Sequence, residues 1–152
     1  FESKTVTKTE NKFFPHVIEP SFGIDRIIYS IFEHNLFERV IDEDRLVLNL
    51  PQNLAVYHVG VFSLFNNDEV CLKAAFEIIQ ELSLVFKVYS DNSTASIGKK
   101  YCRADELGIK YIITVDKETK SDSMVTIRER DSMAQERVAI INLANYLKQL
   151  FI

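Results

Sequence analysis

The sequence of 152 residues has no tryptophan, only two cysteines and no long apolar run. Cys71 and Cys102 lack the spacing of a metal site, so we expect two reduced thiols in a cytosolic protein. No run approaches the ~20 consecutive apolar residues that a membrane-spanning helix needs, and no signal peptide opens the chain. We therefore expect a cytoplasmic protein without a membrane partner.

An excess of positive charge is also missing. The 18 lysines and arginines are outnumbered by 22 acidic residues, which gives a net charge of −4. A nonspecific nucleic-acid binder is normally basic, so any contact with RNA must use a local patch. The sequence has no glycine-rich phosphate loop and no serine–histidine nucleophile arrangement, and its three histidines lack the spacing of metal ligands. These absences argue against enzymes that use a phosphate loop, a serine–histidine pair or a histidine-bound metal ion.

Extended and helical patterns alternate from residue 54 onwards. The predicted strands are 54–64, 85–89, 111–115 and 124–129, and the predicted helices are 69–84, 97–107 and one that starts at a capping box, Ser132 to Gln135. This order, β-α-β-α-β-β-α, predicts an α/β fold of three layers, with helices on both faces of a mixed, mainly parallel sheet. The last two strands have too short a link for a crossover and must pair antiparallel.

The apolar spacing also predicts which helical side chains face the sheet. They are Leu72, Phe76, Ile79 and Leu82 in the first helix, Ile97, Tyr101 and Ala104 in the second, and Val138, Ile141, Ala144 and Leu147 in the last. The polar cluster 66–68 predicts a helix N-cap, and Gly108 suits the left-handed position that follows the second helix.

The first part of the chain predicts shorter elements. They are a strand at 3–8, a turn at 10–12, a strand at 13–19, a turn at 20–23, a helix at 24–37 and a charged linker at 38–44. Arg26 lies in the first turn of that helix, where a cation opposes the helix dipole. This placement makes sense if the guanidinium is directed at a phosphate that the helix end also attracts. Alternatively, Arg26 simply pairs with Glu19.

Residues 15–26 read PHVIEPSFGIDR. This stretch resembles motif 3 of the class II aminoacyl-tRNA synthetases, in the form that glycyl-tRNA synthetases carry. The resemblance implies that Glu19, Ser21 and Gly23 serve the glycine substrate and that Arg26 binds ATP. It also implies that Glu19 and Arg26 are the catalytic residues.

Residues 96–101 read SIGKKY, which is similar to a signature of the glycyl anticodon-binding domain. Lys99, Lys100 and Arg103 follow helical spacing and predict one basic face near a helix N-terminus. The resemblance implies that this face binds tRNA. The alternative is a solvated face on which Arg103 pairs with Glu106.

Residues 128–132 read RERDS, and the same family shows a similar run. Arg128 and Arg130 share the strand face opposite the core. Guanidinium groups suit phosphates and stack on unpaired bases, so we expect both arginines to bind tRNA. The alternative is that Arg130 pairs with Asp131 or Glu136.

Taken together, the resemblance implies part of a glycyl-tRNA synthetase of the eukaryotic or archaeal type. Residues 1–48 would be the end of a catalytic core, and residues 49–152 would be an anticodon-binding domain. The whole enzyme would use ATP with Mg²⁺, glycine and the tRNA(Gly) anticodon stem-loop, and would dimerise through its missing catalytic domain. We expect the fragment alone to hold no cofactor and to be inactive.

Two other functions stay open. One is a free-standing accessory module that descends from a synthetase but binds RNA or protein without catalysis. The other is a small nucleotide-binding α/β domain, which is disfavoured because no glycine-rich turn follows the strand at 54–64. The exposed apolar face of the helix at 24–37 could fold back on the second domain, associate with another copy or stay disordered.

Overall fold

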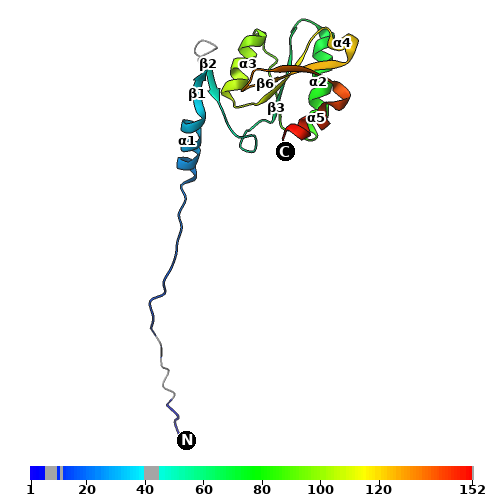
Figure 1. Ribbon diagram of the computed structural model, residues 1–152. Coiled ribbons are helices and arrows are strands. Elements are labelled where there is room, and N and C mark those ends of the chain that lie inside the picture. Colours follow the sequence, from blue (N-terminus) through cyan, green and yellow to red (C-terminus); the bar gives the residue numbers. More distant parts are fainter. Residues whose placement is uncertain (6–9, 11, 40–44, 152) are drawn as a thin grey trace.

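The structure is a computed structural model that describes residues 1–5, 10, 12–39 and 45–151 (Figure 1). Residues 12–23 are extended and form neither a helix nor a strand. The expected strand at 13–19 and turn at 20–23 are therefore wrong, because a strand needs a partner and this segment runs away from the rest of the chain (Figure 1). The elements expected at 3–8 and 10–12 lie partly outside the described residues.

Helix α1 (Ile24–Asn35) leads directly into strand β1 (Leu36–Arg39). None of the twelve residues of α1 is buried, so its apolar stripe faces solvent. Strand β2 (Arg45–Leu48) pairs antiparallel with β1, with Leu36 opposite Leu48 and Arg39 opposite Arg45. The expected linker at 38–44 therefore begins inside a strand, and its residues 40–44 lie outside the described part of the chain.

Five strands form the main sheet in the order β4-β3-β5-β6-β7. They are β3 (Val59–Ser63), β4 (Val88–Ser90), β5 (Tyr111–Val115), β6 (Met124–Glu129) and β7 (Gln135–Ala139). Strand β3 is parallel to β4 and β5, whereas β6 is antiparallel to β5 and β7. The predicted mixed sheet is confirmed, and β5 and β6 have the predicted bounds.

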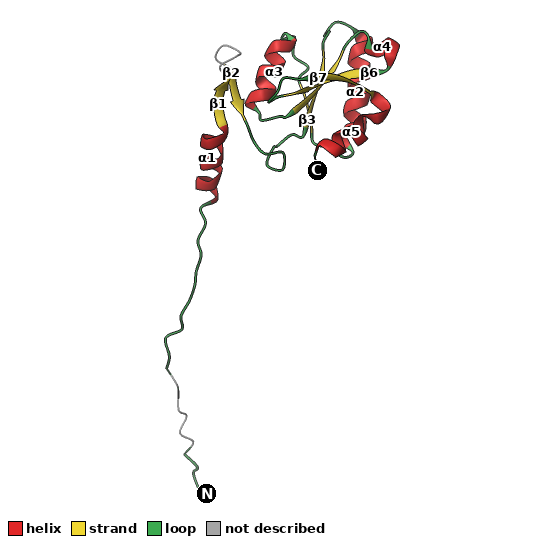
Figure 2. Ribbon diagram, in the orientation of Figure 1, coloured by secondary structure: helices red, strands yellow, loops and turns green. Residues whose placement is uncertain are grey.

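Helices cover both faces of this sheet, which confirms the three-layer α/β architecture (Figure 2). Helices α2 (Glu69–Ser83) and α5 (Leu143–Leu150) pack on one face, over β3, β5 and β6. Helix α3 (Ile97–Glu106) packs on the other, where Ala104 meets Phe62 and Ile112. Two short elements, α4 (Thr119–Asp122) and η2 (Ile140–Asn142), lie in the connections.

The predicted start of the last helix at Ser132 is wrong. The Ser132 hydroxyl donates to Glu129 Oε2 and accepts from the backbone N–H of Ala134, within the turn that joins β6 to β7. Residues 135–139 then pair with β6 along its length. Ladder hydrogen bonds to β6 outweigh the local capping pattern, because they satisfy a whole row of backbone groups.

Helix α2 begins at the predicted cap, where Asp68 accepts hydrogen bonds from the backbone N–H groups of Val70 and Cys71. Its predicted inward line is partly wrong. Leu72 and Phe76 are exposed, whereas the residues buried in the core are Cys71, Ala75, Ile78 and Leu82. The helix carries two apolar stripes, and contact with the sheet selects the one with the smaller side chains.

Candidate functional site

The residues that resemble motif 3 do not form a pocket in this chain. Glu19, Ser21 and Gly23 lie exposed on the extended segment, and Arg26 lies exposed in the first turn of α1. The shallow hollow beside Arg26 is lined by residues of α1 alone, among the described residues. One helix and an extended segment do not enclose a nucleotide. The residues of this chain therefore do not fit ATP by themselves, and on their own they support no catalytic step.

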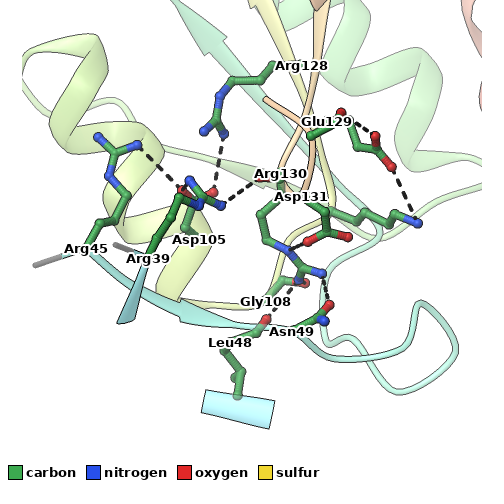
Figure 3. Close-up of polar contacts among 12 residues, drawn as sticks. Arg39, Arg45, Leu48, Asn49, Asp105, Gly108, Arg128, Glu129, Arg130 and Asp131 are labelled. Carbon is green, nitrogen blue, oxygen red and sulfur yellow. Dashed lines mark hydrogen bonds and ion pairs between the residues drawn. The ribbon is translucent and has the colours of Figure 1, made fainter. Parts of the chain in front are cut away.

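A charged cluster surrounds Asp105 near the end of α3 (Figure 3). The Asp105 carboxylate is fully buried. Its Oδ2 accepts from Arg39 Nη1 at 3.2 Å and lies 3.7 Å from Arg45 Nη1. Its Oδ1 accepts from Arg128 Nη1 at 3.3 Å. One carboxylate therefore joins guanidinium groups of β1, β2 and β6.

Arg130 makes a second set of contacts beside this cluster (Figure 3). Its Nη1 donates to the carbonyls of Leu48 at 2.8 Å and Gly108 at 3.2 Å, and its Nη2 donates to the side-chain oxygen of Asn49. Its Nε pairs with Asp131 at 2.7 Å, which confirms one of the alternatives that the sequence leaves open. The guanidinium thus ties the end of β2 to the loops after α3 and β6.

Arg128 lies on the sheet face opposite Val125 and Ile127, as the alternation predicts, whereas Arg130 lies in the turn just after β6. Neither side chain is open to solvent, because Arg128 and Arg130 are only 3% and 1% exposed. Arg128 also stacks at 4.8 Å from the ring centroid of Tyr101. Their donors are engaged inside the protein, and the binding of tRNA by these two arginines stays a prediction.

The expected basic face of α3 is also divided. Lys99 is exposed, but Lys100 is only 1% exposed, and its Nζ donates to Asn66 Oδ1 at 2.7 Å. Burial lowers the pKa of Lys100. Arg103 donates to Asp91 Oδ2 at 2.8 Å and to Ser93 at 3.0 Å, rather than pairing with Glu106. Lys99 and Arg103 therefore keep exposed cationic groups, whereas Lys100 holds the loop after β3 through Asn66.

The pair of Asp91 with Arg103 predicts a pH dependence of stability. Burial alone would raise the pKa of Asp91, but hydrogen bonds from Ser93 and the charge of Arg103 outweigh it and lower the pKa to about 2. A lowered folded-state pKa stabilises the protein above the unfolded value of 3.8, and this contribution is lost as the pH falls towards 2. In urea unfolding between pH 5 and pH 2, we expect a shallower decline for Asp91→Asn than for the unmodified chain. Parallel declines would contradict this prediction.

The loops at the carboxyl ends of the parallel strands form a polar surface with two hollows. Phe65, after β3, is 38% exposed, and Lys117 Nζ, after β5, lies 4.6 Å from its ring centroid. Thr94, after β4, joins residues 64–67 around a hollow of about 370 Å³. A neighbouring hollow of about 430 Å³ is lined partly by Asn66, Phe76 and Asn92. This edge is where ligands of open α/β sheets usually bind.

We name residues 64–67, 92–94 and Lys117 the carboxyl-edge surface. It combines an exposed aromatic ring, a cation and side-chain amides, which is the set of groups that binds unpaired bases. The sequence prediction did not include Phe65, Asn66 and Lys117 among its candidate residues. The signal that could have found them is a polar cluster that directly follows a buried parallel strand.

Two other kinds of site are absent from the described residues. None of their histidine, cysteine, aspartate and glutamate side chains form a group that could hold a metal ion. Over the same residues, every helix is too short or too polar to cross a membrane.

Comparisons with known proteins agree with the fold. Residues 58–150 match the family described as "Anticodon binding domain". The chain is 41% identical over 150 residues to the "Glycine--tRNA ligase" of Methanothermobacter thermautotrophicus, covering 99% of this chain and 26% of the relative. It is 41% identical over 149 residues to "Glycine--tRNA ligase 2" of Saccharomyces cerevisiae, covering 97% and 24%. The chain thus spans about a quarter of the length of these relatives.

A solved structure supports the same family. The RNA binding domain of threonyl-tRNA synthetase from Cryptosporidium parvum superposes with a TM-score of 0.59 at 27% identity, covering 66% of this chain and 25% of that chain. The resemblance to glycyl-tRNA synthetases is confirmed by the relatives above. The unit from β3 to α5 carries the family match, and the chain therefore belongs to the anticodon binding domain family.

Proposed function

We propose that this chain is the part of a glycine–tRNA ligase that binds the anticodon stem-loop of tRNA(Gly). The observation that carries the proposal is the 41% identity to such a ligase over 99% of the chain. The whole protein would activate glycine with ATP and Mg²⁺, form glycyl-adenylate and charge tRNA(Gly), as a homodimer in the cytoplasm. The free thiols of Cys71 and Cys102 are compatible with a reducing compartment.

Within that whole protein, we assign Glu19, Ser21 and Gly23 to the glycine substrate and Arg26 to ATP. The remaining partners of such a site would come from outside this chain. The division into residues 1–48, from the catalytic core, and residues 49–152, the anticodon-binding domain, belongs to the same proposal. This division concerns the origin of the segments rather than their packing, since the hairpin β1–β2 contacts α3.

We place tRNA on the carboxyl-edge surface, together with the exposed groups of Lys99 and Arg103. An anticodon loop presents unpaired bases and phosphates, which match an aromatic ring beside cations. Because the chain is acidic overall, such a local patch must supply the electrostatic attraction. Lys100, Arg128 and Arg130 are assigned a different role. The buried ammonium of Lys100 holds Asn66 of this surface. Arg128 and Arg130 instead join the hairpin, α3 and the main sheet away from it.

Replacing Phe65 with alanine tests the proposed surface. Loss of one base-stacking ring costs about 1–3 kcal/mol, so we expect roughly 5- to 150-fold weaker binding of a tRNA(Gly) anticodon stem-loop. Fluorescence anisotropy at one fixed salt concentration measures the change. The matched control is Leu84→Ala, which removes an exposed apolar side chain before β4, at the opposite edge of the sheet, and should leave binding unchanged. Equal affinities of Phe65→Ala and the unmodified chain would show that the surface is wrongly placed.

A further inference from the structure

The hairpin β1–β2 is fastened to the anticodon-binding unit by a carboxylate that both share. Asp105 belongs to α3, inside the family match, whereas Arg39 and Arg45 belong to the hairpin. Arg39 lies 3.2 Å from Asp105 Oδ2, and Arg128 of the main sheet lies 3.3 Å from Asp105 Oδ1 (Figure 3). The carboxylate therefore bridges hairpin and sheet through its two oxygens.

A second set of contacts fixes the hairpin from the side of the sheet. Arg39 Nη2 donates to the Arg130 carbonyl at 2.6 Å, and the Arg130 guanidinium donates to the Leu48 carbonyl at 2.8 Å. Between these polar contacts, Val47 is fully buried and Leu50 is nearly so. Both strands of the hairpin are thus held, which leaves little freedom to swing against α3.

Helix α1 is joined to this hairpin without a linker. Asn35 ends the helix and Leu36 begins β1. The backbone N–H of Asn49, just after β2, donates to the Asn35 carbonyl at 2.7 Å, so the strand that returns from the hairpin also holds the helix end. The Asn35 side chain donates to the Ile31 carbonyl at 2.7 Å. The direction in which α1 leaves the molecule therefore depends on how the hairpin sits.

We propose that Asp105 is a positioning residue that fixes the direction of α1 relative to the anticodon-binding unit, acting through Arg39 and the hairpin. None of the residues of the helix is buried, so few contacts other than those of the hairpin orient it. The proposal goes beyond tRNA binding and does not depend on it. In a ligase, the same bridge would set where the segment with Glu19 and Arg26 lies relative to bound tRNA.

Spin-label distances within this chain test the proposal. One label replaces Ser30 on α1 and the other replaces Lys73 on α2, both exposed. A reference pair at Lys73 and Lys99 reports on the anticodon-binding unit alone. Cys102 is replaced by alanine so that it does not react with the label. Cys71 is kept, because it is buried. Double electron–electron resonance then measures both distance distributions.

Arg39→Gln is the decisive variant, because it removes the ion pair between β1 and Asp105 but leaves the pair of Asp105 and Arg128 in place. We expect the distribution between α1 and α2 to broaden at least twofold while the reference pair keeps its width. Asp105→Asn should broaden the first distribution at least as much. Arg39→Lys, which restores the charge, should recover part of the narrow distribution.

The control variant is Arg137→Gln, which removes ion pairs to Asp116 and Asp122 within the unit and should change neither distribution. Three outcomes would overturn the proposal. The first is an unchanged distribution between α1 and α2 in Arg39→Gln. The second is equal broadening of both pairs, which would indicate general loss of structure. The third is an unmodified chain whose α1–α2 distribution is already as broad as that of the variants.

Discussion

Replacing Asp105 with asparagine is expected to lower the free energy of unfolding by about 3–5 kcal/mol, the usual effect of removing one partner from a buried ion pair. Asparagine keeps the shape of the side chain but removes the charge that Arg39, Arg45 and Arg128 share. Arg128 is only 3% exposed, so water cannot replace the lost carboxylate there. Urea unfolding at pH 7, followed by circular dichroism, measures the difference.

The matched control makes the same chemical change in an exposed pair. Glu77→Gln removes the carboxylate that lies 4.0 Å from Lys73 on the outer face of α2. Both side chains are exposed, and such a pair contributes only about 0.3–0.5 kcal/mol. If Asp105→Asn lowered stability no more than Glu77→Gln, the cluster would not hold the hairpin energetically, whatever its geometry.

Replacing Gly108 with alanine is expected to lower the free energy of unfolding by about 2–5 kcal/mol. Gly108 has φ +76°, a conformation that costs a residue with a Cβ roughly 1–2 kcal/mol. The added Cβ would also lie 3.1 Å from the Leu48 carbonyl oxygen and 3.3 Å from Leu50 Cδ1. Such overpacking adds about 1–3 kcal/mol, because the neighbouring atom is backbone and cannot rotate away. Thermal and urea unfolding both measure this loss.

Gly98→Ala is the control, at a glycine inside the helix that Gly108 follows. A Cβ at Gly98 meets nothing within 4 Å, and alanine in a helix is favoured over glycine by up to about 1 kcal/mol. We therefore expect Gly98→Ala to be neutral or stabilising. Gly108→Asn separates the two causes, since asparagine tolerates the left-handed conformation but still carries a Cβ. A loss for Gly108→Ala below about 0.5 kcal/mol would mean that neither strain nor close approach matters at this position.

Local chemistry in the sequence was sufficient for several elements of the second part of the chain, although not for β7. β5 and β6 begin and end at the predicted residues, and the caps at Asp68 and Gly108 are where the sequence places them. These signals depend on neighbours within a few residues: alternation along a strand, a side-chain acceptor before a helix, a left-handed glycine after one. Such short-range information needs no knowledge of the tertiary structure.

The same local reasoning failed where the local pattern allows two structures for one segment, or two buried faces for one helix. Residues 135–139 carry a helix-start signal but become β7, because the unpaired edge of β6 offers a full ladder. Helix α2 has two apolar stripes, and only the packed sheet shows that Ala75 and Ile78 face inwards while Phe76 faces out. The extended segment at 13–19 has the composition of a strand but pairs with none of the residues that the structure describes.

The sequence by itself determined the α/β order as far as β6, the family and the segment that resembles motif 3. Only the tertiary structure decided which lysines and arginines are exposed and which are buried and hold other parts of the chain. Lys and Arg are read as exposed by default, since they are rarely buried without a partner. The partners here are far away in sequence: Asp105 lies 66 residues from Arg39, and Leu48 lies 82 residues from Arg130. A charge is buried when such a partner offsets its desolvation, and that can be known only once the chain has folded.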